Sequence, residues 1–182
     1  MAIRPVRMYG DPVLRQKALP VAEIDDTVRE MVADMRETMA AYQGVGLAAN
    51  QIGVLQRVLV VDVPVDEQTR VRHALVNPVI DKRQGTDTAE EGCLSIPGIY
   101  EDVRRADIVR VRALDEHGQP VEFTAEGYLA RAIQHEVDHL DGVLFIDRLS
   151  ALKRHFLRGA LDAIARGELP GGFRPPLAGG AI

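Results

Sequence analysis

The stretch GYLARAIQHEVDHLDG, residues 127–142, predicts the helix on which the rest of the fold depends. Its apolar residues recur at intervals of three and four, as they do on one face of an α-helix. These residues are Leu129, Ile133, Val137 and Leu140. Gly142 follows the last of them, where a glycine commonly ends a helix. The same stretch contains the pattern HExxH, so one helix is expected both to pack into the core and to carry polar chemistry.

His135 and His139 project from the same side of this predicted helix. Positions four apart differ by about 40° around a helix axis, so the two imidazoles can bind one metal ion together. Glu136 lies about 60° from His139, where it can reach a water on that ion without being a ligand. Alternatively, these three side chains could be ordinary polar residues on a solvent-exposed helix. A match of all three residues to HExxH is rare by chance, however. The pattern therefore predicts a metal site with a separate proton acceptor.

The metal site needs one more donor, because catalytic zinc sites use three protein ligands and leave one position for water. Cys93 is the favoured candidate, since a thiolate is a strong metal donor and the adjacent Gly92 allows close backbone approach. Taken alone, a single cysteine is more often an inert buried thiol. The other histidines have no partner at ligand spacing and are expected to be surface or packing residues. They are His73, His117 and His155.

Length and composition predict one globular domain. The chain has 182 residues, of which 46% are hydrophobic and 27% charged. The net charge is -5, and the basic residues are scattered and do not form a stripe that could bind a phosphate backbone. Direct nucleic-acid readout is therefore not expected. No apolar run approaches the roughly 20 residues of a membrane span, and residues 1–10 lack the core of a secretory signal. With a single cysteine and no sign of disulfides, a cytoplasmic location is expected.

Three other stretches are predicted to be helical, because a capping residue precedes their apolar positions. They cover residues 11–14, 26–42 and 150–166. The last carries a stripe that is expected to pack on the core, formed by Leu152, Phe156, Leu157, Leu161 and Ile164. Because Gly167 breaks this pattern, residues 1–166 are predicted to form a single catalytic domain and residues 167–182 a flexible, Pro/Gly-rich tail that is dispensable for chemistry.

Valine-rich and alternating segments predict the strands. They are residues 57–63, 71–77, 79–83, 107–114 and 121–125. Pro78 is expected to separate the second from the third, and the last two read as a hairpin. Because helices and strands follow one another without regular alternation, an α+β domain is expected, with mixed or antiparallel β-sheets around the HExxH helix and an additional C-terminal helix.

Three segments, in this order, resemble the signatures of the peptide deformylase family: GVGLAANQ at residues 44–51, EGCLS at 91–95 and QHEVDHLDG at 134–142. The first, taken alone, reads equally well as a helix terminus followed by a tightly packed turn. GDPVLR at residues 10–15 and FIDRL at 145–149 extend the similarity to about residues 4–155. The resemblance implies a metallohydrolase that removes the N-formyl group from nascent polypeptides beginning with formylmethionine and releases formate.

The resemblance also implies roles for individual residues. Cys93, His135 and His139 would be the ligands and Glu136 the general acid and base, in agreement with the reasoning from the residues themselves. The side-chain amide of Gln51 and the backbone N–H of Leu94 would donate to the oxyanion formed on the formyl carbonyl. Val45, Gly46 and Gly92 would meet the peptide backbone. Tyr128 and Ala132 precede His135 on its side of the helix and either line a methionine pocket or pack in the core.

The cofactor and partners are implied in the same way. One divalent ion is expected, natively Fe²⁺, with Zn²⁺ or Ni²⁺ as replacements in purified protein. The partners would be formylmethionyl nascent peptides and, transiently, the ribosome, for a monomer without membrane association. Tyr100 departs from the pattern, since many relatives carry an arginine there near the bound peptide. The resemblance therefore leaves peptide affinity open.

Two other functions are compatible with parts of the pattern. A zinc peptidase of the HExxH type would take its third ligand downstream, where only Glu168 and His155 are available. A non-catalytic metal-binding or ribosome-associated protein on the same fold would not need Glu136 or Gln51, and both are present. The pattern as a whole favours the deformylase.

Overall fold

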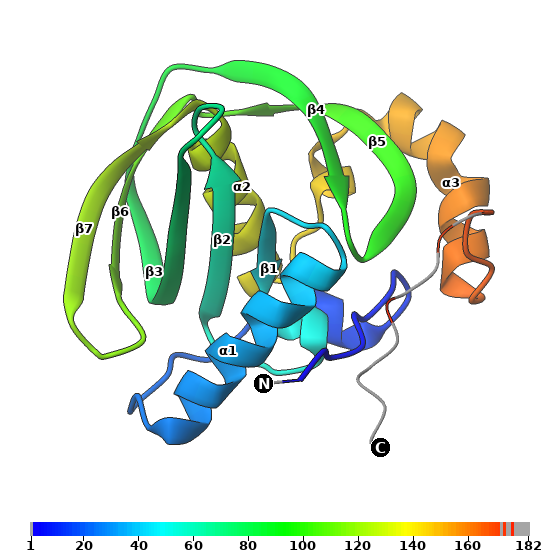
Figure 1. Ribbon diagram of the computed structural model, residues 1–182. Helices are drawn as coiled ribbons and strands as arrows, with labels where there is room; N and C mark the ends of the chain where they lie inside the picture. Colours follow the sequence, from blue (N-terminus) through cyan, green and yellow to red (C-terminus); the bar gives the residue numbers. More distant parts are fainter. Residues whose placement is uncertain (1, 172, 174–175, 177–182) are drawn as a thin grey trace.

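The computed structural model of the chain describes residues 2–171, 173 and 176, and Figure 1 shows the arrangement of their elements. Within these residues, seven strands form two antiparallel sheets, accompanied by three α-helices and three short 3₁₀-helices. The predicted α+β class, the antiparallel sheets and the additional C-terminal helix are confirmed. No helix of this described part of the chain is long and apolar enough to cross a membrane.

The larger sheet has five strands in the order β1-β2-β3-β6-β7, each antiparallel to its neighbours. Their bounds are Gly46–Ala48 for β1, Val58–Pro64 for β2, Arg70–Gln84 for β3, Ile108–Leu114 for β6 and Pro120–Glu126 for β7. The predicted hairpin is confirmed as β6 and β7, in which Val111 lies opposite Phe123.

The prediction that Pro78 separates two strands is wrong, because β3 is continuous through this residue. Proline has no N–H group to donate to a neighbouring strand. The ladder between β3 and β6 shifts register between Val76 and Val79, so Pro78 does not have to donate a hydrogen bond there. Asn77, with a φ of 53°, exchanges two side-chain hydrogen bonds with the backbone of Val21, at 2.8 and 2.9 Å. A bulge thus replaces the expected break.

Two regions that carry site residues depart from the sequence-based expectation. Residues 44–51 include the edge strand β1 and most of the 3₁₀-helix η2 (Ala49–Ile52) rather than a helix terminus and turn. The strands β4 (Asp87–Cys93) and β5 (Ile96–Arg105) pair as a separate two-stranded sheet that was not predicted. The sequence of β4, DTAEEGC, lacks the apolar alternation that indicates a strand.

The three α-helices match the stretches predicted from apolar spacing: α1 (Asp26–Ala41), α2 (Gly127–Leu140) and α3 (Ala151–Ala165). Side chains cap two of them, since Asp25 accepts from the N–H of Val28 at 3.0 Å and Ser150 accepts from that of Lys153 at 3.2 Å. The short predicted helix near the start is η1 (Pro12–Arg15), and η3 (Phe145–Arg148) follows α2.

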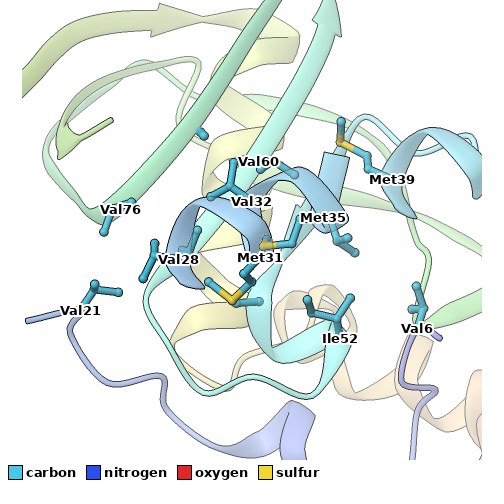
Figure 2. Packing of buried hydrophobic residues seen from close by; sticks show 14 residues of the cluster. Val6, Val21, Val28, Met31, Val32, Met35, Met39, Ile52, Val60 and Val76 are labelled. Carbon is cyan, nitrogen blue, oxygen red and sulfur yellow. The ribbon is translucent and has the colours of Figure 1, made fainter. Parts of the chain in front are cut away.

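The five-stranded sheet is covered on both faces, by α1 on one side and α2 on the other (Figure 1). Figure 2 shows the α1 side, where Met31 and Met35 pack with Val60 of β2. The alternate residues of β2, Leu59 and Val61, belong to the cluster that contains the apolar face of α2. The first four residues of β2 form a continuous apolar run, as expected for a strand that is buried on both faces. The HExxH helix is thereby fixed against the centre of the sheet.

The predicted packing stripe of α3 is only half correct. Leu161 and Ile164 are buried against η1 and η3, whereas Leu152 and Phe156 are 64% and 75% exposed. The helix therefore contacts the core from the partly buried Leu157 onward, and Leu152 and Phe156 face solvent.

Replacing Leu59 by alanine is expected to lower the free energy of unfolding by about 2–5 kcal/mol, because the side chain is fully buried and leaves a cavity. Leu152→Ala is the matched control and should change it by no more than about 0.5 kcal/mol. Urea unfolding followed by circular dichroism measures both. Equal losses in the two variants would contradict the placement of Leu59 in the core.

Candidate metal centre

Cys93, His135 and His139 come together at one point, and a ligand atom from each lies within 4.8 Å of the other two. Cys93 ends β4, whereas both histidines lie on α2. The sulfur of Cys93 is 3.2 Å from Nε2 of His139. One thiolate and two imidazoles are a donor set that holds zinc or another first-row divalent ion. The structure thus brings together the three donors predicted from the sequence, and the group could hold a metal ion.

Glu91 fixes the orientation of His135. Its carboxylate lies 3.0 Å from Nδ1 of His135, so that nitrogen can donate and leave Nε2 for a ligand role. Arg105 donates two hydrogen bonds to Glu91, at 2.5 and 2.8 Å, and Arg131 donates a third at 2.8 Å. Burial opposes ionisation, but the hydrogen bonds and charges of Arg105 and His135 prevail and lower the pKa of Glu91 to about 2. Glu91 is therefore an ionised carboxylate inside the protein.

The same network of charged side chains extends to Asp138 of α2. Arg105 also donates to Asp138 at 2.7 Å, and Arg148 of η3 makes two hydrogen bonds to Asp138 at 2.5 and 2.6 Å. The chain of charges thus joins the β4–β5 hairpin to the metal-binding helix and to the segment after it. Sequence reasoning gave no role to Glu91 or Asp138, although both lie inside the quoted motifs. The available signal was a carboxylate two residues before the candidate ligand cysteine.

Glu136 is 4% exposed, and its Oε2 atom has no hydrogen-bond partner among the described residues. Burial raises its pKa to about 7. Gly46 makes room for this side chain, because a Cβ added to Gly46 would lie 2.9 Å from the carboxyl carbon of Glu136. An unpartnered buried carboxyl beside three metal donors fits a site that is completed by an ion and its water.

Gln51 is fixed at both ends of its amide. Its oxygen accepts from the N–H of Ala48 at 2.8 Å, and its nitrogen donates to the hydroxyl of Ser95 at 3.2 Å. The same nitrogen lies 3.7 Å from the sulfur of Cys93. The amide N–H₂ group therefore lies beside the donor cluster.

A cavity of about 420 Å³ adjoins the donor cluster. Cys93, His135, Glu136 and Gln51 line its inner end. The remaining predicted site residues also lie on its wall, namely Val45, Gly46, Gly92, Leu94, Tyr128 and Ala132. His73 lies elsewhere and stacks on Phe123 with ring centroids 4.4 Å apart. Among the described residues, the donor group includes neither His155 nor Glu168, the two downstream candidates for the third ligand of a peptidase of the HExxH type.

A sequence model described as polypeptide deformylase matches residues 3–155 of the chain. The chain belongs to the polypeptide deformylase family. Members of this family are metal-dependent hydrolases that remove the N-formyl group from nascent peptides, so the function predicted from the sequence is confirmed. Peptidase activity and non-catalytic metal binding are the alternatives that this membership disfavours.

Individual relatives extend the similarity over most of the chain. The peptide deformylase of Alkalilimnicola ehrlichii is 53% identical over 166 residues, which cover 91% of this chain and 93% of the relative. The crystal structure of the Legionella pneumophila enzyme has a TM-score of 0.83 at 46% identity and covers 92% of this chain and 98% of that one. The Ehrlichia chaffeensis enzyme in complex with actinonin has a TM-score of 0.85 at 36% identity, with coverages of 92% and 99%.

Replacing Glu91 by glutamine is expected to weaken zinc affinity by about 10- to 100-fold, because the neutral amide no longer holds His135 as a basic, oriented ligand. Competition with a chromophoric chelator measures the affinity, at a temperature where circular dichroism shows the variant folded. Glu90→Gln is the matched control, since Glu90 is an exposed acid next to Glu91 on the strand. Equal weakening in both variants would show that net charge, and not Glu91, determines the affinity.

Proposed function

We propose that Cys93, His135 and His139 hold one divalent ion and that Glu136 transfers the protons of formyl-group hydrolysis. The observation that carries the proposal is the convergence of three donor atoms beside a buried carboxyl group with an unpartnered oxygen. A divalent ion bound there supplies Lewis acidity, which polarises a carbonyl group and makes water a better nucleophile near neutral pH. We propose Fe²⁺ as the native ion, as the family resemblance implies, with Zn²⁺ or Ni²⁺ in purified protein. A thiolate and two imidazoles are compatible with all three ions.

Glu136 is suited to carrying a proton because its pKa is about 7. A group with such a pKa can accept a proton from water as the oxygen attacks the formyl carbon, and can return it to the leaving amine nitrogen. The bond between the formyl carbon and that nitrogen then breaks, and formate and a free amino terminus are released. Gly46 leaves the space that the carboxyl group occupies, since a larger residue there would displace it.

Gln51 and Leu94 are the proposed donors to the formyl oxygen, where negative charge develops during the attack. The fixed amide of Gln51 supports its role, because a donor held by Ala48 and Ser95 needs no reorganisation when the charge appears. Leu94 follows Cys93 directly, so its N–H lies in the same turn as the proposed ligand. Removing one donor of this kind typically costs about 10² to 10³ in rate.

The substrate that we propose is a formylmethionyl nascent peptide. Val45, Gly46 and Gly92 would meet its backbone, and Tyr128 and Ala132 would line the methionine pocket. Their positions around the cavity support these assignments. We further propose that the protein is cytoplasmic and monomeric and contacts the ribosome transiently, as expected for a hydrolase of nascent chains. With a net charge of -5, it would not read nucleic acid directly.

The direct test is formate release from formyl-Met-Ala-Ser by iron- or nickel-loaded protein, with internal peptide cleavage followed in the same samples. Glu136→Ala is expected to lower the rate of formate release by at least about 10²-fold, because the proposed general acid and base is lost. Metal analysis after anaerobic purification should show an unchanged ion content, since Glu136 is not a proposed ligand.

Three results would count against the proposal. Peptide cleavage without formate release would indicate a peptidase. Loss of metal from Glu136→Ala would assign this residue to the ligand set. Wild-type turnover in that variant would remove it from proton transfer.

A further inference from the structure

The residues that follow α3 return to the cavity of the donor cluster. Gly167, with a φ of 81°, reverses the chain after the helix, and the N–H of Glu168 donates to the carbonyl of Ala163 at 2.9 Å. Leu169 then packs against the apolar cluster that contains Leu14 and the buried residues of α3 and β5. The start of this segment is therefore attached to the core, and Figure 1 shows it turning back from α3 toward the hairpin.

Pro170 and Phe173 bring the segment onto the β4–β5 hairpin. A Cβ added to Gly98 of β5 would lie 2.8 Å from Cγ of Pro170, so the proline ring packs directly on this glycine. The N–H of Phe173 donates to the carbonyl of Pro170 at 3.0 Å, which closes a turn. Phe173 thereby becomes a wall residue of the same cavity that contains Cys93 and Glu136.

Residues of two kinds line the cavity. Cys93, Glu136 and Gln51 are polar and belong to the proposed reaction site, whereas Pro97, Tyr100 and Phe173 are apolar or aromatic. Tyr100 is 62% exposed, and its ring covers Gly92, since a Cβ added there would lie 2.5 Å from Cε1 of the ring. Two aromatic side chains and a proline thus present apolar surface beside the backbone of the ligand strand, in a cavity that Glu90 and Arg131 also line.

We infer that Phe173 is a specificity-determining residue, which together with Tyr100 and Pro97 forms an apolar subsite for the side chains that follow methionine in the peptide. The inference rests on the proposed function, in which the formyl group lies at the donor cluster and the methionine side chain beside Tyr128 and Ala132. The rest of the peptide must then leave along the open part of the cavity. Aromatic side chains gain most from contact with apolar and aromatic partners, so leucine and phenylalanine at the second and third positions are favoured.

The experiment compares formyl-Met-Leu-Phe with formyl-Met-Ala-Ser on the full-length, nickel-loaded chain. Phe173→Ala is expected to raise KM for formyl-Met-Leu-Phe by about three- to thirtyfold and to leave KM for formyl-Met-Ala-Ser within about twofold, because only the first peptide loses an aromatic contact. The kcat for both peptides should not change, since Phe173 is neither a proposed metal ligand nor a proposed proton carrier. Tyr100→Ala should reduce the preference in the same direction.

Phe156→Ala is the matched control, because Phe156 is 75% exposed on α3 and does not line the cavity. It should change neither KM. Calorimetric binding of the product peptides Met-Leu-Phe and Met-Ala-Ser provides a readout that does not depend on turnover. The wild-type chain should bind the first more tightly, and Phe173→Ala should remove that difference.

Two outcomes overturn the inference. If Phe173→Ala changes KM equally for both peptides, or not at all, Phe173 does not select the downstream residues. If the substitution increases kcat/KM, the segment obstructs the groove instead of completing it. A wild-type chain that releases no formate from either peptide would refute the proposed function, and the product-binding comparison would still decide whether Phe173 selects apolar side chains.

Discussion

The structure depends on the buried ion pair between Glu91 and Arg105. Both side chains are almost fully excluded from solvent, and Asp138 and Arg131 extend the pair on either side. Removing one partner from such a network leaves an uncompensated charge in the interior, which typically costs about 3–5 kcal/mol. Glu91 and Arg105 both lie on the β4–β5 hairpin, and their hydrogen bonds to Arg131 and Asp138 join the hairpin to α2. Since Cys93 lies on that hairpin and the two histidines on α2, these bonds fix the donors relative to one another.

The surroundings of two carboxyl groups near the donors shift their pKa values in opposite directions. Glu91 is surrounded by cationic groups, and its pKa falls to about 2. Glu136 is buried with one oxygen unpartnered, and its pKa rises to about 7. A carboxylate that is permanently charged can orient a ligand, whereas one that titrates near neutrality can carry a proton. This division explains how two acids in one site can serve different purposes.

The parts of this arrangement that are local in sequence could be predicted. Helical periodicity and HExxH located α2 and both histidines, because the spacing within one helix determines which side chains share a face. The β4–β5 hairpin could not be found in this way, since its first strand is mostly polar and is stabilised by charges from Arg105 and Arg131. The bulge at Pro78 depends on the pairing of β3 with β6, which is distant in the chain. The buried part of α3 is likewise determined by the distant residues that it contacts, so the exposed part could not be predicted. Cys93 lies 42 residues before His135, and no spacing rule joins them.

Strand register determines which residues of EGC reach the metal-binding helix. Side chains alternate along β4, so Glu91 and Cys93 point to the side of α2, while Gly92 faces the ring of Tyr100. A shift by one residue would direct both functional side chains away from the histidines and press a side chain against Tyr100. The register of the β4–β5 ladder shifts between Glu91 and Cys93. Cys93 pairs with Ile96, and this pair closes the hairpin next to its turn. The pairing of Glu91 with Arg105 opposes such a slip, because the slip would also bury two unpaired charges.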